Sequence, residues 1–214
     1  MNKNHPIALL KIGLNAYMAE LLYEGHVFMN TAEYFSTLED GTPRSDPDEG
    51  VGYLQKADGA ILKMQDADEW CSLGTIAGAI RFRPDALKTT NLYCLHAKTV
   101  SDYGEAFQLN ELKLGDSYVL FTNGNEFLKR LKKAVLKAGH ECTYGMVNYI
   151  DRNDYTGPMS LFRKFSEFAN TREFRVVVTP GAGGAMSLRL GDLSDIAIMG
   201  SANERLRLDP KVLP

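Results

Sequence analysis

Residues 7–30 read IALLKIGLNAYMAELLYEGHVFMN, and the expected fold is built outward from this stretch. The apolar run Ile7–Ile12 is suited to a strand. Asn15 offers an N-cap for the helix that follows, and Gly25 is the residue type that commonly ends a helix. The run His26–Asn30 then predicts a second strand. The chain is therefore expected to begin with the order strand, helix, strand.

Beyond residue 75 the chain is dominated by runs that are typical of strands. One clear helix interrupts them, because Phe127, Leu131 and Val135 recur at helical spacing with Lys and Arg between them. A shorter helix is expected across Pro158–Phe168. The expected strands are Ile76–Phe82, Asn91–Ala97, Ser117–Thr122, Tyr144–Ile150, Glu173–Thr179, Ala185–Leu190 and Ile196–Met199. These patterns predict a mixed α+β fold, with a strand-rich second half, in a single domain spanning residues 1–214.

The segment at about 39–70 is a long excursion rich in Asp, Gly and Pro, with one short strand expected near Val51–Leu54. A loop of this length inside a compact domain is usually functional. The stretches Phe28–Phe35 and Arg44–Gly50 concentrate ionisable and hydrogen-bonding groups, which favours a binding or catalytic site on a loop. The alternative is a solvated acidic turn, since turn chemistry explains much of the composition.

The overall charge supplies no field that would attract nucleic acid or an anionic membrane, because 24 Lys and Arg stand against 27 Asp and Glu. Cys71, Cys94 and Cys142 lie far apart without a Cys-x-x-Cys pair, so we expect reduced thiols. The first apolar run is too short for a signal peptide, and no segment approaches the roughly 20 apolar residues of a membrane span. We therefore expect a cytoplasmic protein without membrane contact.

The glycine-rich stretch Thr179–Ala185 resembles a phosphate-binding loop in composition only. Such a loop leads from a strand into a helix whose N-terminus holds the anion. Strands are expected on both sides of this stretch. A hairpin connection is therefore the favoured interpretation.

Metal binding by side chains has one candidate group. The four histidines show no i, i+4 pair, so a zinc or iron site is not predicted. Asp46, Asp48 and Glu49 could hold a hard cation such as Mg²⁺, although the regular spacing of a calcium loop is missing. The motifs of serine and cysteine hydrolases are also missing from the sequence. No dedicated metal site is predicted.

Glu173 and Arg175 stand two residues apart at the start of a strongly predicted strand, so their side chains share a face. They can form a plain ion pair, which contributes little at a surface. The alternative is a carboxylate that stabilises a developing cation beside an arginine that holds a phosphate. The residues alone leave both interpretations open.

The order of the motifs carries a resemblance that covers most of the chain. The motif residues are Lys11, Leu22, Gly25, Val27, Met29–Asn30, Tyr34–Phe35, Arg44, Asp46, Glu49–Gly50, Tyr93–His96, Gly115–Asp116, Glu126–Leu128, Arg130–Leu131, Lys164–Phe165, Glu173–Arg175 and Leu190–Ile196. This order resembles a large bacterial family of uncharacterised domains that is frequent in phage-defence and toxin–antitoxin loci. The family signature is an Asn or Arg with Asp-Pro-x-Glu after the second strand, followed by a late Glu-x-Arg strand.

That family is similar in layout to ADP-ribosyltransferases, which grip NAD with an early strand–helix–strand unit and carry a catalytic glutamate on a later strand. The resemblance implies that NAD is the substrate and that Glu173 is the catalytic residue. It implies NAD contacts from Lys11, Asn30, Thr31, Tyr34 and Arg44. It also implies a substrate loop containing Asp46 and Glu49, with Arg175 beside it.

The chain departs from the transferase pattern at three points. The first strand lacks the usual His or Arg, the second lacks Ser-Thr-Ser, and Thr171 or Arg172 stands where a second glutamate would precede Glu173. In similar enzymes that second glutamate helps to activate a protein arginine, so its absence favours a nucleic-acid acceptor. The basic helix around Lys129–Lys137 is then a candidate backbone-binding face, although such a face is usually just solvated.

Three functions are carried forward from the sequence. The first is an NAD-dependent ADP-ribosyltransferase acting as a phage-defence or toxin effector, with RNA or DNA as candidate acceptor and an antitoxin or phage protein as candidate partner. The second is a non-catalytic module of the same fold that binds a nucleotide or a protein. The third is a metal-dependent nuclease built on Asp46, Asp48 and Glu49.

Overall fold

Strand β1 (Pro6–Gly13) lies inside the main sheet, where it pairs with β7 on one side and β9 on the other. The apolar side chains of β1 pack on both faces of the sheet. Leu9 belongs to one hydrophobic core, while Leu10 and Ile12 belong to another. The sheet runs in the order β10-β14-β7-β1-β9-β16, and all of these neighbours are antiparallel. The computed structural model describes residues 5–38, 45–57, 61–63, 65–66, 68–72, 78–153 and 155–208.

The mixed α+β class is confirmed, with strands predominating. The helices are α1 (Asn15–Glu24), α2 (Ala32–Thr37), α3 (Asp85–Lys88) and α4 (Gly124–Lys137), with 3-10 turns η1 (Val100–Asp102), η2 (Asn110–Leu112) and η3 (Ser166–Thr171). The strands after β1 are β2 (His26–Thr31), β3 (Tyr53–Lys56), β4 (Ile61–Leu62), β5 (Cys71–Ser72), β6 (Ala79–Phe82), β7 (Asn91–Thr99), β8 (Ala106–Phe107), β9 (Ser117–Phe121), β10 (Cys142–Met146), β11 (Asn148–Ile150), β12 (Gly157–Pro158), β13 (Arg163–Phe165), β14 (Glu173–Val178), β15 (Met186–Arg189), β16 (Ala197–Ser201) and β17 (Leu206–Arg207).

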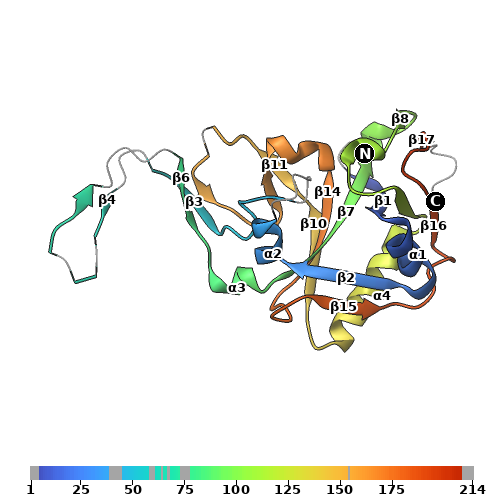
Figure 1. Cartoon of the computed structure of the whole chain (residues 1–214), viewed down its shortest axis with the longest axis horizontal. Helices are drawn as coiled ribbons and strands as arrows, with labels where there is room; N and C mark the ends of the chain where they lie inside the picture. Colours follow the sequence, from blue (N-terminus) through green and yellow to red (C-terminus); the bar gives the residue numbers. More distant parts are fainter. Residues whose placement is uncertain are drawn as a thin grey trace.

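The largest core lies between one face of the main sheet and the two longer helices. Met18 and Leu21 of α1, and Phe127 and Leu131 of α4, are buried there against strand residues such as Val119. Strands β2 and β15 close this core. Figure 1 shows them side by side, crossing the direction of β7 and β14. The amphipathic pattern of α4 therefore predicted its packing correctly.

The first strand–helix–strand unit is confirmed, with one difference at the helix start. Leu14 is the N-cap residue and Asn15 is the first helical residue. The Asn15 side chain donates to the hydroxyl of Ser117 at 3.2 Å instead of capping the helix. Gly25 ends the helix in the left-handed conformation, as predicted.

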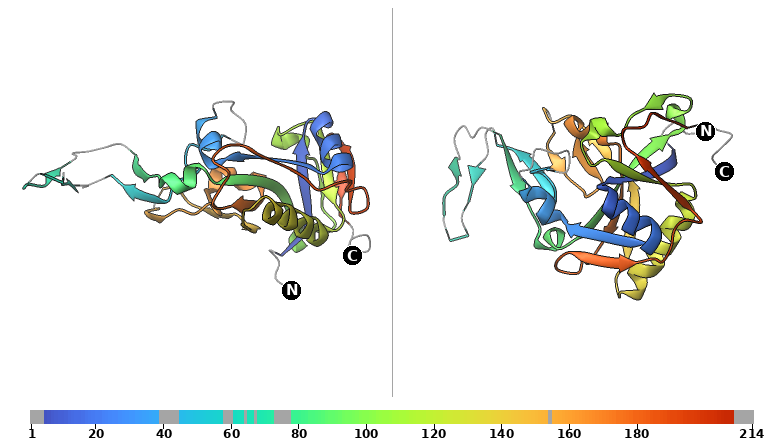
Figure 2. Two further views of the ribbon diagram at one scale, coloured as in Figure 1. Left: turned by 90° about the horizontal axis from the view of Figure 1, so that it is seen from below. Right: turned by 45° about the vertical axis from the view of Figure 1, so that its right-hand side comes forward.

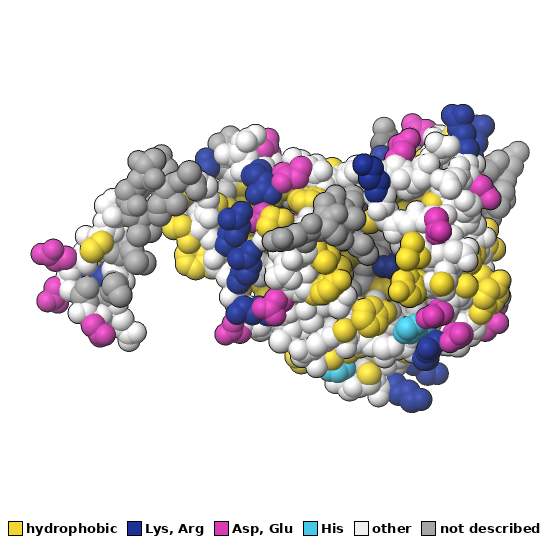
Figure 3. Space-filling model, viewed as in Figure 1, with side chains coloured by type: hydrophobic (Ala, Val, Ile, Leu, Met, Phe, Trp, Pro, Cys, Tyr) yellow, Lys and Arg dark blue, Asp and Glu magenta, His cyan; other side chains and the backbone are white. Residues whose placement is uncertain are grey.

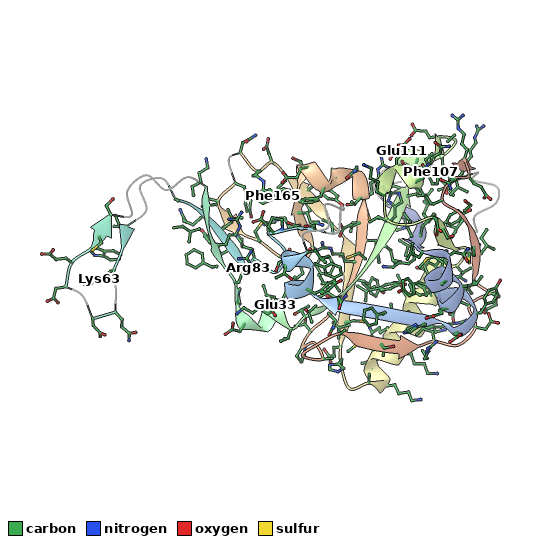
Figure 4. The ribbon with its side chains drawn as sticks, in the orientation of Figure 1. Glu33, Lys63, Arg83, Phe107, Glu111 and Phe165 are labelled. Carbon is green, nitrogen blue, oxygen red and sulfur yellow. The ribbon has the colours of Figure 1, made fainter. Side chains whose placement is uncertain are left out.

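A small second sheet, β12-β3-β6, extends from the main body, and β4 and β5 pair beyond it. Figures 1 and 2 show the β4–β5 pair at the end of the molecule farthest from β1 and β16. In the space-filling view of Figure 3, Lys and Arg side chains gather where this small sheet meets the main body, a region that includes Arg83, labelled in Figure 4. The expected excursion at 39–70 thus contributes β3 and β4 in its described parts, while residues 39–44, 58–60, 64 and 67 lie outside the described residues.

Two of the predicted secondary-structure elements are wrong. Pro158–Phe168 forms no α-helix but contains the end of β12, strand β13 and the start of η3, because Arg163–Phe165 pairs in parallel with Asn148–Ile150 of β11. Tertiary pairing overrides the local helical pattern here. Likewise, Tyr144–Ile150 is not one strand, since it divides into β10 and β11, which pair with different partners.

The glycine-rich stretch before β15 is not a hairpin either. Strand β14 pairs with β7 and β10, whereas β15 pairs with β2, so the stretch carries the chain from one part of the sheet to another. The amide of Asn91 holds it in place by donating to the carbonyl of Gly184 at 2.7 Å and accepting from the N–H of Ala182 at 2.8 Å. A Cβ at Gly181 would lie 1.8 Å from the carbonyl oxygen of Thr89, which explains the glycine by close packing.

Candidate functional site

Two segments that are far apart in the chain meet at Arg175 on β14. Its guanidinium donates to both carboxylate oxygens of Glu49, at 2.9 and 2.6 Å. Its Nε donates to Oε2 of Glu173 at 2.8 Å, and Nη1 also donates to the carbonyl of Leu161 at 2.6 Å. Arg175 is 1% exposed. Two buried carboxylates therefore neutralise and orient one buried guanidinium.

The carboxylate of Glu173 is engaged by cations on both oxygens. Oε1 accepts from Nζ of Lys164 at 3.0 Å, while Oε2 accepts from Arg175. Burial raises the pKa of Glu173, but Arg175 and Lys164 outweigh burial and lower that pKa to about 2. The backbone N–H of Glu173 donates to the hydroxyl of Tyr149 at 2.8 Å. Glu173 is 7% exposed and is held ionised at neutral pH.

Lys164 joins Glu173 to the loop that contains Asp46. Its Nζ lies 3.5 Å from Oδ2 of Asp46 and 4.5 Å from the ring centroid of Phe168. Asp46 also accepts the backbone N–H of Asp48 at 2.9 Å. Burial raises the pKa of Asp46 in spite of the nearby ammonium.

Asp48 forms the outer part of the same network. Its oxygens accept from Nε of Arg81 at 2.5 Å and from Nη1 of Arg152 at 2.8 Å. Arg152 also pairs with Glu167 and lies 3.9 Å over the ring of Phe165. We call the following residues the ionic cluster: Asp46, Asp48, Glu49, Arg81, Arg152, Lys164, Glu173 and Arg175.

The ionic cluster unites the predicted substrate loop with the predicted catalytic strand. It also bears on the candidate cation ligands, because each of Asp46, Asp48 and Glu49 pairs with a Lys or Arg. Among the residues that the structure describes, no group of three or more His, Cys, Asp and Glu side chains is arranged to hold a metal ion. A cation at these carboxylates would have to displace buried side-chain cations.

The predicted NAD-binding residues lie on other elements. On β1, Lys11 donates from Nζ to the carbonyl of Cys94 at 2.9 Å and lies 4.3 Å from the ring centroid of Tyr93. Asn30 pairs with Leu92 in the ladder between β2 and β7.

The two remaining described residues of that prediction mark the start of α2. Thr31 is the N-cap of α2 and accepts the N–H of Tyr34 at 3.2 Å. Tyr34 is 45% exposed. Arg44 lies outside the described residues.

A cavity of about 280 Å³ lies between α2 and the loop that carries Glu49. Glu33 and Arg83, both labelled in Figure 4, line it together with Gly50 and Lys88. The predicted NAD contacts Thr31 and Tyr34 belong to the segment that lines this cavity, because α2 begins directly after Thr31.

The expected basic face of α4 is exposed but partly neutralised. Lys129 and Arg130 both pair with Glu126, at 3.3 and 3.1 Å. Arg130 also pairs with Asp195 at 2.5 Å. The helix therefore carries fewer unpaired cations than its sequence suggests.

A larger cavity, of about 680 Å³, lies over His96 and Lys98 of β7. We call it the β7 pocket. Its walls come from residues in the ranges 102–112 and 170–172, and from Arg205. Phe107 and Glu111, labelled in Figure 4, lie together on one wall, at the opposite end of the molecule from Lys63.

Thr171 links the β7 pocket to the ionic cluster. Its carbonyl accepts from Nδ1 of His96 at 2.8 Å, and its hydroxyl bonds with the hydroxyl of Tyr149 at 3.1 Å. His96 also lies directly opposite Glu173 in the ladder between β7 and β14. The pocket and the cluster are therefore neighbours on one face of the sheet.

His96 is the unusual member of the pocket. It is 7% exposed, and its Nε2 is a buried atom for which the described residues supply no hydrogen-bond partner. A buried polar atom without a partner costs about 1–3 kcal/mol and needs an explanation. Burial lowers the pKa of His96 to about 4, so the ring is neutral at pH 7.

No sequence motif singles out His96, Lys98 and Arg172 as a group. A search for metal-ligand spacing passes over a single histidine. The usable signal was the alternation His96-x-Lys98 at the end of the strand predicted over Asn91–Ala97, since the observed strand continues to Thr99 and places both polar side chains on one face.

No protein-family model matches the chain, and neither a curated protein nor a solved structure matches it. Among the described residues, no helix is both long and apolar enough to cross a membrane. Cys71, Cys94 and Cys142 are free. The resemblance to the phage-defence family and to ADP-ribosyltransferases stays a prediction.

Proposed function

We propose that this chain is a binding module that holds a small molecule in the β7 pocket, and that Glu173 carries out no turnover. The observation that carries the proposal is the buried Nε2 of His96, which lacks a partner at the wall of a cavity of about 680 Å³. Ligand pockets span roughly 300–1,000 Å³ and use few, well-placed polar groups. A ligand that bonds to Nε2 would remove an existing energetic penalty.

The environment of Glu173 supports the non-catalytic half of the proposal. A carboxylate that stabilises an oxocarbenium ion must reach the ribose of the substrate. Both oxygens of Glu173 are engaged by Lys164 and Arg175 in a buried site. Freeing one of them would take from a buried cation one of its two carboxylate partners, which is unfavourable.

The test combines binding with turnover. We expect AMP or ADP-ribose to raise the thermal midpoint of the purified protein, because a ligand that binds only the folded state stabilises it. We expect no nicotinamide release from NAD, with or without bacterial RNA, DNA or lysate protein. Nicotinamide release by the wild type that is lost in Glu173→Gln would overturn the proposal.

An NAD-dependent ADP-ribosyltransferase is the second candidate. The observation that favours it is the 280 Å³ cavity between α2 and the Glu49 loop, which carries the cations Arg83 and Lys88. It lies beside the element to which the resemblance assigns NAD contacts. Under this alternative, nicotinamide release should fall in Arg83→Met, whereas Arg189→Met on β15, a side chain that is 55% exposed, should have no effect.

A further inference from the structure

The hydrogen bonding of His96 fixes which chemical group it can accept. Nδ1 lies 2.8 Å from the carbonyl oxygen of Thr171, and a carbonyl oxygen only accepts, so Nδ1 carries the proton. In the neutral ring, Nε2 is then an acceptor. Nε2 faces away from Thr171, since the two ring nitrogens point in different directions. A ligand at this position must therefore offer an O–H or N–H donor.

Lys98 supplies the complementary group two residues farther along β7. It is 8% exposed, and its Nζ lies 3.7 Å from the ring centroid of Phe107. Burial lowers the pKa of Lys98, with charged neighbours Asp102, Arg172 and Glu105. Among these neighbours, the carboxylate of Asp102 pairs with Arg172 and accepts the backbone N–H of Thr99. The ammonium is therefore available to an anionic ligand.

The distance between the His96 and Lys98 side chains along β7 sets the separation of the two ligand groups that they can contact. Side chains two residues apart on a strand share a face and are separated by roughly 6–7 Å. A sugar or hydroxy acid places a hydroxyl and an anionic group across such a span. Glu105 and Glu111 also line the pocket, which disfavours a ligand with many negative charges.

We propose that the β7 pocket binds a hydroxylated anion of low charge, with its phosphate or carboxylate on Lys98 and a hydroxyl donating to Nε2 of His96. This inference rests on the proposed function, because it names the chemistry of the ligand that the same pocket holds. Nε2 is buried, so the ligand must displace a flexible side chain at the rim.

The first experiment compares four probes by calorimetry and thermal shift on the full chain. Ribose 5-phosphate and gluconate carry both groups and separate the phosphate source from the carboxylate source. Sulfate carries the charge without a donor, and ribose carries hydroxyls without the charge. We expect ribose 5-phosphate or gluconate to bind at least about tenfold more tightly than sulfate and ribose. Equal affinity for sulfate, or no binding by any probe, would overturn the inference.

The second experiment uses matched lysine variants. Lys98→Met removes the ammonium while retaining an apolar stem of similar length, so we expect the affinity for the better probe to fall about tenfold or more. Lys98→Arg should retain part of the affinity. Lys129→Met, which changes a side chain that is 79% exposed on α4, is the control and should bind as the wild type does. Unchanged binding in Lys98→Met would contradict the proposal.

A third measurement needs no variant and so does not depend on how a substituted chain folds. With ¹⁵N-labelled histidine, the resonance of an unprotonated Nε2 moves when this nitrogen accepts a hydrogen bond. We expect the His96 Nε2 signal to shift on addition of the binding probe, while the Nδ1–H signal persists. A His96 spectrum that does not respond to a bound probe excludes His96 as the acceptor.

The outcomes separate this inference from the proposed function. If AMP or ADP-ribose binds with an affinity that Lys98→Met leaves unchanged, the chain is a binding module and the assignment of the β7 pocket fails. If NAD is turned over through Glu173, the proposed function itself fails, whatever the probes show at Lys98.

Discussion

Arg175 and Glu49, which are 126 positions apart in the chain, form a two-pronged ion pair with N–O distances of 2.9 and 2.6 Å. Both side chains are buried, at 1% and 5% exposure. This pair fastens the acidic loop onto β14, and the carboxylate of Glu173 completes the coordination of the same guanidinium. The segment that the sequence presents as a charged surface loop is therefore anchored in the interior.

A double-mutant cycle across this pair measures the interaction free energy between Glu49 and Arg175. Glu49→Gln and Arg175→Met should each lower the free energy of unfolding by roughly 3–5 kcal/mol, because Glu49→Gln removes one of the two carboxylates that neutralise Arg175, and Arg175→Met removes the cation from Glu49. The double variant should lose clearly less than the sum of the two losses. Urea unfolding followed by circular dichroism provides the measurement. Additive losses would show that the two side chains stabilise the fold independently.

Glu173→Gln tests the structural role of the predicted catalytic residue. The substitution keeps the shape but removes the charge that Lys164 and Arg175 share, so we expect a loss of roughly 3 kcal/mol or more. Glu126→Gln is the matched control, since Glu126 also pairs with two cations but on a partly exposed helix surface. It should lower the stability far less, because ion pairs at an exposed surface contribute little. Similar midpoints for both variants in chemical unfolding would show that the charge of Glu173 contributes no more to stability than the charge of Glu126.

His96 predicts a pH dependence of stability. Its pKa is about 4 in the folded chain, against an ordinary value of 6.5, mainly because the ring is buried. Between these values the unfolded chain binds a proton that the folded chain does not. The free energy of unfolding should therefore fall by about 2–3 kcal/mol as the pH drops from 6.5 to 4, and should not change through this group above 6.5.

The comparison with His96→Phe isolates this contribution. The variant lacks the titrating ring and should show a shallower loss of stability over the same pH range. Glu173, whose folded pKa is about 2, acts in the same direction only below about pH 4.5, and it is present in both proteins. Equal slopes between pH 6.5 and 4 would show that the ring of His96 is not shielded from protonation.

Two glycines with positive φ provide a test of backbone packing. Gly25 has a φ of 61°, and an added Cβ would lie 2.2 Å from the carbonyl oxygen of Gly191. Gly139 has a φ of 84°, with nothing within 4 Å of an added Cβ. Gly139→Ala should cost about 1–2 kcal/mol from the backbone conformation alone, and Gly25→Ala roughly 3 kcal/mol or more because the clash adds to it. Equal midpoints in thermal unfolding would show that the chain near Gly191 can move aside.

The regular elements followed from local patterns in the sequence. The apolar run of β1, the left-handed stop at Gly25 and the helical repeat of Phe127, Leu131 and Val135 are each decided by nearby residues. The shared face of Glu173 and Arg175 followed as well, because side chains alternate along any strand. These features depend on dihedral preferences and periodicity, which a single sequence contains.

Pairing between distant segments could not be read in this way. Arg163–Phe165 is a strand because it pairs with β11. Likewise, β15 does not form a hairpin with β14 because it pairs with β2. The β7 pocket likewise depends on η2 and the turn at Arg172 coming together over β7. The sequence by itself determined the longer regular elements, such as β1, α1 and α4, and the presence of charged residues on β14 and in the acidic loop. The tertiary structure alone decided that these charges are buried and paired, because burial and ion pairing depend on which distant side chains share the same volume.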